Sequence, residues 1–150
     1  MKDKTSKSSS KKIEYLHGFS AAEQERLKKQ AEFIEYKVYK DIDFSDQKDV
    51  LEVGCGVGAQ SSILLRRFPR MPLPGIAFRA PPLSPAKQTL NATPYAEGRY
   101  KLQQMDAQQM KFKPQSFDGA FLCWVLEHIP DPQKVVQEVR RVLKPGGVVY

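Results

Sequence analysis

Residues 49–58 of this 150-residue chain, D-V-L-E-V-G-C-G-V-G, decide the fold. The first half is short and apolar, which is typical of a buried strand. The second half has glycine at every other position, so the backbone can turn sharply and a ligand can approach the main chain closely. A helix is predicted over residues 59–68, and its N-terminus would face that ligand. Several nucleotide-binding families share such a glycine-rich turn, so the turn alone does not separate them.

Segments with strand and helix patterns alternate along the rest of the chain. Ser20 and Glu23 form a capping-box pattern, which predicts a helix over residues 21–39. Further helices are predicted over residues 84–91 and from Asp131, and further strands over 99–105, 117–123 and from Val148. The last helix is expected to stop at residues 144–147, and its apolar face is predicted to comprise Val135, Val136, Val139, Val142 and Leu143. The alternation predicts an α/β fold with a doubly wound, Rossmann-like parallel sheet, truncated after the start of strand five.

The composition indicates an ordinary globular domain, with 41% hydrophobic and 27% charged residues. No apolar run approaches the roughly 20 residues that a bilayer span requires, and the first 25 residues lack the apolar core of a secretory signal. Cys55 and Cys123 match neither a zinc spacing nor a disulfide framework, so no metal site is expected. These features favour a reducing, cytoplasmic setting.

The net charge of +7 is concentrated at the N-terminus. Residues 1–12 hold five lysines against one aspartate, which accounts for +4 of that charge. This stretch cannot bury apolar surface, so a disordered basic tail is predicted there. A solubilising leader is favoured over a nucleic-acid contact, although a basic tail is compatible with both.

Further motifs follow the glycine turn in a fixed order. Asp106-Ala107 follows the third predicted strand, F-D-G-A through V-L-E-H-I spans residues 117–129, and L-K-P-G-G spans residues 143–147. Together with E-V-G-C-G-V-G, these stretches resemble the ordered motifs of class I S-adenosylmethionine-dependent methyltransferases, over roughly residues 50–150. The resemblance implies methyl transfer by in-line displacement, with S-adenosylmethionine as the donor. It also implies a methyltransferase core over residues 49–150, with its C-terminal part missing.

The same resemblance assigns roles to particular residues. Glu52 would lie beneath the glycine turn and fix the amino-acid portion of the donor, while Asp106 would accept a hydrogen bond from the adenine amino group. Trp124 would lie near the sulfonium, where an aromatic face stabilises a cation by about 0.5–2 kcal/mol, although core packing is an equally good interpretation. The full set of implied cofactor contacts is Glu52, Gly54, Cys55, Gly56, Gly58, Ala77, Asp106, Ala107, Cys123 and Trp124.

Residues 13–48 are expected to form an N-terminal helical lid or cap, as such segments do in this family. Tyr15 and Phe19 are candidate acceptor-site residues in that lid. Phe19 could equally act as a hydrophobic staple on the first helix. His128 is the candidate general base, since it follows the fourth predicted strand, but a packing role is the more common one at that place.

The acceptor class follows from motifs that are missing. C-W-V-L occupies residues 123–126, where nucleic-acid amino-methyltransferases carry N/D-P-P-Y/F. No catalytic-cysteine motif of the cytosine-C5 kind is present either, which favours a small-molecule acceptor of the quinone, sterol or natural-product type over nucleic acid. Two alternatives remain open. Gly54, Gly56 and Ala59 also satisfy G-x-G-x-x-A, the pattern of NAD(P)-binding oxidoreductases, and the protein could be a binding-only, inactive relative. The oligomeric state is not predicted.

The second predicted strand falls in an unusual segment. Six of the eleven prolines lie within residues 69–85, although proline is confined to the edges and ends of strands. The family pattern T-G-I-D-x-S-x-x-Q aligns on residues 74–82 and puts Ala77 where the ribose-binding acid belongs. Four of the differences, including Ala77 and Arg79, each correspond to one A-to-C base change, which suggests a sequence-reading artefact or a damaged copy. Alternatively, Arg79 beside a missing acid would suit the 2′-phosphate of NADP.

Overall fold

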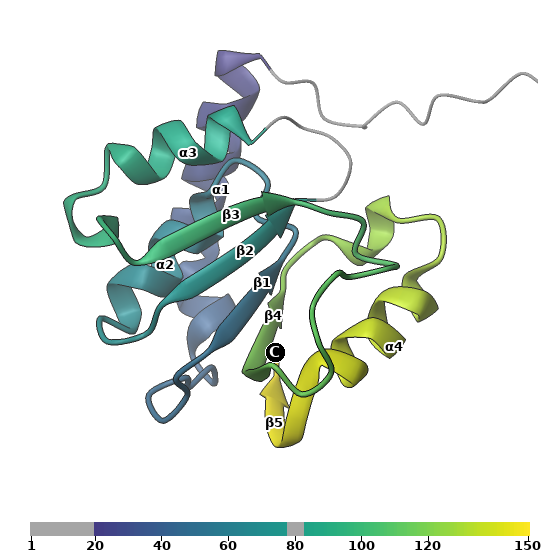
Figure 1. Ribbon diagram of the computed structural model, residues 1–150. Helices are drawn as coiled ribbons and strands as arrows, with labels where there is room; N and C mark the ends of the chain where they lie inside the picture. The colour runs from purple at the N-terminus through teal and green to yellow at the C-terminus, as the bar shows by residue number, and fades with distance from the viewer. Residues whose placement is uncertain (1–19, 78–82) are drawn as a thin grey trace, which may run out of the picture.

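The computed structural model describes residues 20–77 and 83–150 and confirms the doubly wound α/β fold. Its five strands are all parallel and are ordered β3-β2-β1-β4-β5 (Figure 1). The order reverses between β1 and β4, so their carboxyl ends flank the topological switch point of the sheet. The strands are β1 (Val50–Val53), β2 (Leu73–Ala77), β3 (Tyr100–Gln104), β4 (Phe117–Leu122) and β5 (Leu143–Val149).

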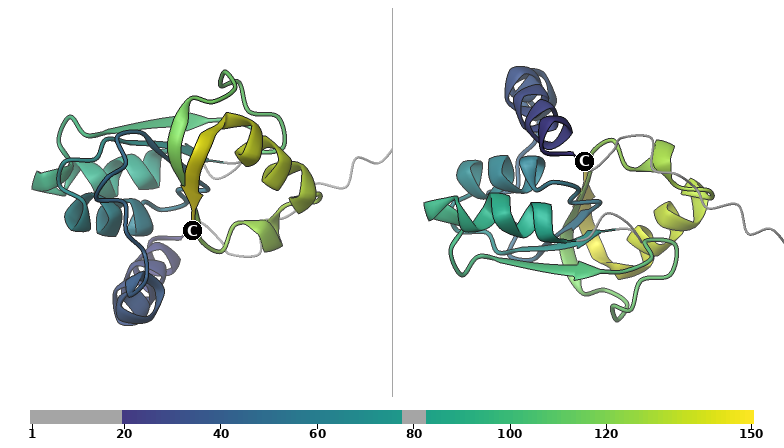
Figure 2. Two further views of the ribbon diagram at one scale, coloured as in Figure 1. Left: turned by 90° about the horizontal axis from the view of Figure 1, so that it is seen from below. Right: turned by 90° about the horizontal axis from the view of Figure 1, so that it is seen from above.

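Helices cover both faces of the sheet (Figure 2). The helices are α1 (Ala21–Tyr39), α2 (Ala59–Arg67), α3 (Ser84–Asn91) and α4 (Pro132–Val142), with short 3₁₀ turns η1 (Pro94–Ala96) and η2 (Leu126–His128). One core cluster joins α1, α2 and α3 to the sheet, and the other joins α4 and the segment 105–116 to the opposite face. Alternate residues of β1 enter the two clusters, Val50 the first and Leu51 the second, which explains why this strand carries apolar residues on both faces, with Glu52 as its one polar residue.

The predicted helix starts are confirmed by their caps. The Ser20 hydroxyl accepts a hydrogen bond from the Glu23 backbone N–H at 3.2 Å, and α1 begins at the next residue. The Asp131 carboxylate accepts from the Lys134 N–H at 3.2 Å ahead of α4. Each cap satisfies one of the backbone donors that a helix start leaves without a partner.

Two expectations for α4 are wrong. The helix ends at Val142, close to the predicted end, but Leu143 lies in β5 rather than on the helix face, and residues 144–147 belong to the same strand rather than to a connecting turn. The β4–β5 register shifts between Phe117 and Gly119, and Gly146 adopts φ 78°, so the Pro-Gly-Gly segment forms an irregularity of the strand. Val136 is 54% exposed and does not belong to the apolar face that packs on the sheet.

The proline-rich segment still contains a strand. β2 pairs with β3 from Leu73 onward, whereas its pairing with β1 begins only at Gly75. Pro74 therefore lies ahead of the residues that pair on both sides, where the loss of its N–H removes the least from the ladder.

Two domain expectations concern residues wholly or partly outside the described ranges. The predicted tail, residues 1–12, is wholly outside, and the predicted cap is described only from residue 20. The described part of the cap packs on α2, because Ala31 and Tyr39 of α1 belong to the same core cluster as Ile63 and Leu64. None of the helices within residues 20–77 and 83–150 combines the length and apolar character that a membrane crossing needs.

Candidate functional site

A cavity of about 460 Å³ opens at the carboxyl ends of β1 and β4, on the switch point of the sheet. The loops that follow these two strands form most of its wall, and α1 closes one side. The lining residues are Arg26, Leu27 and Gln30 of α1, then Gly54, Cys55, Gly56, Val57, Ala59 and Gln60 after β1, and Cys123, Trp124, Glu127 and His128 after β4. Parallel sheets bind ligands in the crevice at such a point.

The glycine loop needs its glycines for backbone conformation and for space. Gly54, Gly56 and Gly58 have φ values of 87°, 50° and 80°, a region that L side chains rarely adopt. A Cβ on Gly54 would lie 2.5 Å from Val125 Cγ2, whereas a Cβ on Gly56 would meet nothing within 4 Å. The loop is held to β2 because the Gly54 and Cys55 N–H groups both donate to the Ile76 carbonyl, at 2.8 and 3.0 Å. A ligand can therefore approach the main chain at Gly56, in a loop whose backbone is held in place by hydrogen bonds.

Glu52 is a buried carboxyl directly before this loop. It is 1% exposed and accepts a hydrogen bond from the Ser61 hydroxyl at the start of α2. Burial raises the pKa of Glu52 to about 7, and the Ser61 hydrogen bond opposes that shift. Glu52 is therefore a group whose charge changes near neutral pH, two residues before Gly54 on the wall of the cavity.

The two cysteines of the cavity are thiols. Burial raises the pKa of Cys55, and burial also raises the pKa of Cys123 to about 11, with a further contribution from the negative charge of Glu52 in each case. The nucleophilic form of cysteine is the thiolate, so neither side chain is poised for nucleophilic attack at neutral pH.

The segment after β4 contributes a strained aromatic residue. Trp124 has φ 51°, one of two positive values among the described non-glycine residues, and its side chain is 46% exposed at the cavity. His128 ends the η2 turn and lies 4.0 Å from Glu127, measured from His128 Nε2 to Glu127 Oε1. Backbone strain of this kind persists where the surroundings enforce it and is concentrated at ligand sites.

Asp106 and Ala107 follow β3 and are not among the lining residues of the cavity. Asp106 Oδ1 accepts hydrogen bonds from the backbone and side-chain nitrogens of Gln108, at 2.9 and 3.2 Å. Ala107 is buried. Ala77 is the last residue of β2 and pairs with Gln104, so its backbone lies at the same edge of the sheet as the glycine loop.

The structure brings one group of the expected cofactor residues together and leaves others aside. Gly54, Cys55, Gly56, Cys123, Trp124 and the candidate base His128 line one cavity. Glu52 lies beneath it, and Gly58 turns the chain into α2, where an added Cβ would lie 3.1 Å from the Ala86 carbonyl oxygen. The candidate acceptor residues Tyr15 and Phe19 lie outside the described residues.

Sequence reasoning expected residues 13–48 to form a lid but did not name Arg26, Leu27 or Gln30 of α1 as wall residues. Arg26 and Gln30 lie one turn apart, and the Arg26 guanidinium donates to Gln30 Oε1 at 2.8 Å and to the Glu23 carboxylate at 2.7 and 2.8 Å. Gln60 was missed as well. The i, i+4 spacing of Arg26 and Gln30 marks a common helix face, but nothing in the sequence indicates that this face approaches the glycine loop.

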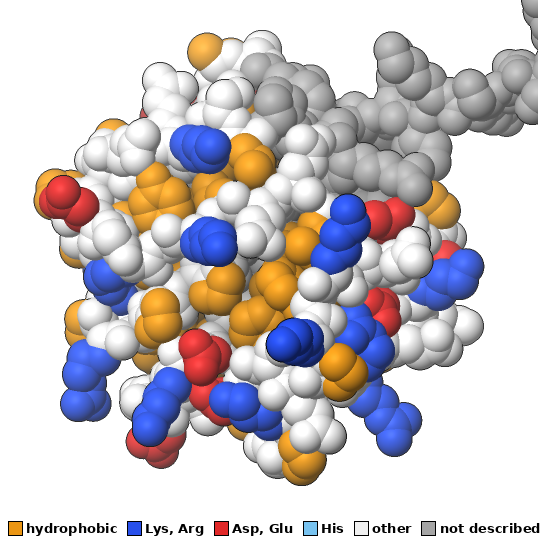
Figure 3. Space-filling view, viewed as in Figure 1, with side chains coloured by type: hydrophobic (Ala, Val, Ile, Leu, Met, Phe, Trp, Pro, Cys, Tyr) orange, Lys and Arg blue, Asp and Glu red, His pale blue; other side chains and the backbone are white. Residues whose placement is uncertain are grey.

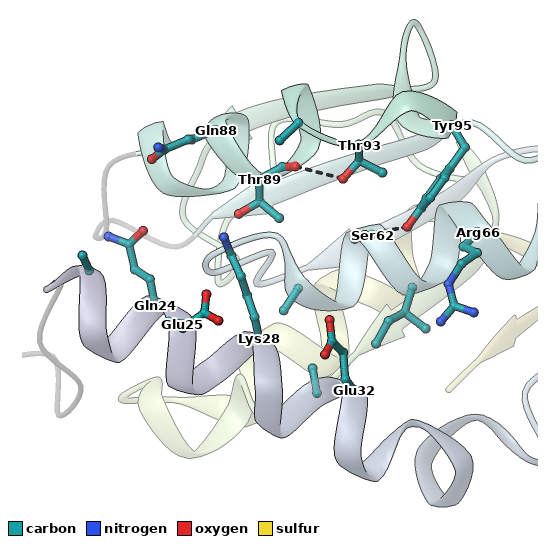
Figure 4. A pocket seen from close by; sticks show the side chains of 15 residues that line it. Gln24, Glu25, Lys28, Glu32, Ser62, Arg66, Gln88, Thr89, Thr93 and Tyr95 are labelled. Carbon is teal, nitrogen blue, oxygen red and sulfur yellow. Dashed lines mark hydrogen bonds between the residues drawn. The ribbon is translucent and has the colours of Figure 1, made fainter.

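A second cleft, of about 500 Å³, lies between α1, α2 and α3 (Figure 4). Lys28 and Gln24 point from α1 toward α3, and the Ser62 and Tyr95 hydroxyls are hydrogen-bonded at 3.0 Å on its far side. Of the described residues that the sequence singled out for a site, Ala59 lines this cleft, and it lines the cavity at the glycine loop as well. Gly54, Cys55, Gly56, Cys123, Trp124 and His128 line only the cavity at the glycine loop.

The surface gives no sign of a nucleic-acid track on the face viewed in Figure 1. Lys and Arg side chains are scattered there among hydrophobic ones and do not form one stripe (Figure 3). Among residues 20–77 and 83–150 there is also no group of three or more His, Cys, Asp or Glu side chains that could hold a metal ion.

Comparison with known proteins places the fold and motifs in one family. Residues 51–150 match the family model described as a methyltransferase domain. The chain is 38% identical over 99 residues to a demethylmenaquinone methyltransferase of Desulfitobacterium hafniense, an alignment that covers 66% of this chain and 35% of that protein. It is 35% identical over 103 residues to a ubiquinone biosynthesis O-methyltransferase of Klebsiella pneumoniae, covering 69% and 41%. The chain thus spans about two fifths of the length of these relatives.

Solved structures share the architecture at lower identity. A SAM-dependent methyltransferase from Aquifex aeolicus superposes with a TM-score of 0.69 at 19% identity, over 85% of this chain and 69% of that one. The [4+2]-cyclase SpnF superposes with a TM-score of 0.66 at 23% identity, over 85% and 43%, so the fold by itself does not fix the reaction. On the family match, the chain belongs to the methyltransferase-domain family, within the class I, Rossmann-like S-adenosylmethionine-dependent methyltransferases.

Proposed function

We propose that this protein binds S-adenosylmethionine and transfers its methyl group to a small-molecule acceptor. The observation that carries the proposal is the cavity at the switch point, with the left-handed glycine loop on one wall and the end of β4 on the other. The residues fit such a ligand, because Gly56 leaves open space where any side chain would intrude.

The bound donor supplies an electrophilic methyl group on a sulfonium, which an acceptor displaces in line. In this proposal Gly54, Gly56 and Gly58 admit the amino-acid and ribose portions, and Asp106 and Ala107 receive the adenine at the end of β3. Glu52 beneath the loop, in its ionised form, attracts the ammonium of the amino-acid portion. Cys123 and Trp124 face the sulfonium, where the indole stabilises a cation by about 0.5–2 kcal/mol.

The chain's contribution to the rate is mainly positioning. In this proposal the fixed glycine loop and Trp124 hold the reacting centres within reach, and orientation of this kind removes a large share of a bimolecular barrier. His128 is the proposed proton acceptor for an acceptor hydroxyl, since it lines the same cavity as Trp124. An acceptor that is already anionic would not need it.

A small-molecule acceptor is supported by the shape and by the relatives. Trp124 is exposed at the cavity and offers a flat apolar surface, while α1 covers one side, as proposed for a lid formed from residues 13–48. The relatives named above are a demethylmenaquinone methyltransferase and a ubiquinone biosynthesis O-methyltransferase. A sterol 4-C-methyltransferase of Caenorhabditis elegans is 27% identical over 134 residues, covering 85% of this chain and 38% of that one. We further propose a reducing, cytoplasmic setting in which both cysteines remain thiols.

The only tryptophan of the chain supplies the test. Because Trp124 lines the cavity, titration with S-adenosylmethionine is expected to change its fluorescence in a saturable way, and calorimetry is expected to give the same affinity. The Trp124→Phe variant should still bind S-adenosylmethionine in the calorimeter, but it should show no change in tryptophan fluorescence. Saturable binding of NADP(H) without binding of S-adenosylmethionine would favour the oxidoreductase alternative and overturn the proposal.

A further inference from the structure

Gln60 is a polar side chain of the cavity that the glycine motif does not include. It is the second residue of α2, and it lines the cavity together with Gly54 and Gly56. Its amide oxygen is already engaged, because the Tyr39 hydroxyl donates to Gln60 Oε1 at 2.6 Å. The hydrogen bond joins the last residue of α1 to the first turn of α2.

Tyr39 cannot easily move, so it fixes the amide. Its side chain is 1% exposed, and its ring stacks on Phe121 of β4 with centroids 5.6 Å apart. On the other side, the Arg67 guanidinium lies 5.4 Å from the ring centroid and donates to the Tyr39 carbonyl at 3.2 Å. Burial raises the pKa of the Tyr39 hydroxyl, which therefore stays protonated and acts as a donor.

The geometry of a planar amide then sets what Gln60 presents to a ligand. With Oε1 turned to Tyr39, Nε2 occupies the other arm of the amide and carries two N–H donors. No residue within 20–77 or 83–150 accepts a hydrogen bond from Nε2. One of these N–H groups can donate to one oxygen of a carboxylate, and a hydrogen bond to an ionised acceptor is stronger than one to a neutral acceptor.

The position of Gln60 identifies which part of the donor it would meet. Tyr39 packs on β4, so Gln60 lies toward the β4 side of the glycine loop, whereas Asp106 follows β3 at the far side of the sheet. Arg26 of α1 adds a guanidinium to the same cavity, already paired with the Glu23 carboxylate, and Glu127 adds a carboxylate that is 54% exposed. A wall with charged groups of both signs beside the Gln60 amide matches a zwitterionic amino acid rather than an adenine.

Resting on the proposed use of S-adenosylmethionine, we propose that Gln60, oriented by Tyr39, binds the carboxylate of the amino-acid portion and selects ligands that carry it. Gln60 is then a specificity residue, and Tyr39 is a positioning residue that acts through it. The prediction is a discrimination between two ligands, S-adenosylmethionine and decarboxylated S-adenosylmethionine, which lacks only that carboxylate.

Calorimetric titration of both ligands tests the inference. Gln60→Leu is expected to weaken S-adenosylmethionine binding about tenfold or more, because a hydrogen bond to a charged group is lost, and to leave the decarboxylated ligand within about twofold. Gln60→Glu adds repulsion and should weaken the first ligand about 100-fold. Tyr39→Phe keeps the ring and loses the hydroxyl, so a smaller loss, confined to the first ligand, is expected. Gln137→Glu makes the same change on the exposed side of α4 and serves as the control.

The outcomes separate this inference from the proposed function. A wild-type chain that fails to bind S-adenosylmethionine overturns the proposed function. A wild-type chain that binds it, with a Gln60→Leu variant that weakens both ligands equally or neither, overturns the role of Gln60. Thermal melts of each variant show whether the fold is retained, and Gln60→Leu and Tyr39→Phe, which add no charge, decide the matter if Gln60→Glu does not fold.

Discussion

Gly56→Ala should chiefly weaken ligand binding, whereas Gly54→Ala should chiefly lower the stability of the fold, although both residues belong to one loop. At Gly56, φ is 50° and a Cβ meets nothing within 4 Å, so the loss of unfolding free energy is the strain of a left-handed residue alone, about 1–2 kcal/mol. At Gly54 the same strain is joined by a contact of 2.5 Å with Val125 Cγ2. Overpacking of that kind costs a further 1–3 kcal/mol or so, giving a total of about 2–5 kcal/mol.

Ligand binding should rank the two variants differently. The methyl group of Gly56→Ala occupies space that the ligand needs, so S-adenosylmethionine is expected to bind about 10- to 100-fold more weakly, the equivalent of about 1–3 kcal/mol of overpacking. Gly54→Ala should chiefly lower the denaturant midpoint. Urea unfolding of the chain without ligand, combined with calorimetric titration, measures both quantities.

Gly98 provides a matched control for the strain. Its φ is 68°, a Cβ there also meets nothing within 4 Å, and it lies before β3, away from the cavity. Gly98→Ala should therefore lower the unfolding free energy by about 1–2 kcal/mol and leave the ligand affinity unchanged. If Gly56→Ala binds S-adenosylmethionine as tightly as Gly98→Ala does, the cavity is not the cofactor site and the reasoning is refuted.

Three further predictions concern carboxyl groups of the site. Asp106→Ala should weaken S-adenosylmethionine binding by about 1–3 kcal/mol in a calorimetric titration, through the loss of a half-buried hydrogen-bond partner. The pKa of Glu52 is raised to about 7 in the folded chain from an ordinary value of 4.5. The unfolding free energy of the wild type should therefore fall by about 3 kcal/mol as the pH rises from 4.5 to about 7, when it is compared with that of Glu52→Gln at each pH. Urea unfolding at pH 4.5, 6 and 8 measures that difference. Ala77→Asp should strengthen S-adenosylmethionine binding by about 1–3 kcal/mol in the same titration, by restoring an acceptor for the ribose hydroxyls.

Controls separate chemistry from folding in each case. Asp106→Asn keeps an acceptor for the Gln108 nitrogens, so a loss shared by Asp106→Ala and Asp106→Asn arises from the charge rather than from the turn. A difference between wild type and Glu52→Gln that does not change with pH would contradict the buried, protonated carboxyl. If Ala77→Asp leaves S-adenosylmethionine binding unchanged and abolishes NADPH binding, the result favours the alternative in which Arg79 binds the 2′-phosphate of NADP.

The elements that the sequence predicted well are those whose signals are local. The bounds of α1 follow from the Ser20 cap and the apolar spacing behind it, and the bounds of α3 agree with the predicted residues 84–91. The Pro-Gly-Gly segment was wrongly predicted to be a turn, because proline and glycine both end helices and cause irregularities in strands. Pairing with β4 makes this segment part of a strand. Val136 misled because it lies at the rim of the apolar stripe of α4, where periodicity alone does not separate core from surface.

The candidate site divides in the same way. Gly54, Gly56 and Trp124 come from contiguous motifs and were predicted, because the turn after a strand carries its ligand contacts within a few residues. Arg26 and Gln60 were not predicted, because their place on the cavity depends on how α1 packs on α2. That packing includes the hydrogen bond from the Tyr39 hydroxyl to Gln60, which joins residues 21 positions apart in the chain. Contacts at that sequence distance have no pattern in a single sequence.

The proline-rich segment shows how the fold and the chemistry of one strand can be separated. Pro74 pairs on one side only, so β2 forms in spite of it, and the register from Gly75 to Ala77 carries the strand to the same carboxyl edge as the glycine loop. The exchange of an acid for Ala77 therefore alters what the edge can bind without removing the strand that positions it. Ligand affinity distinguishes a repurposed pocket from an impaired one, and resequencing of codons 70 to 86 distinguishes either from an artefact.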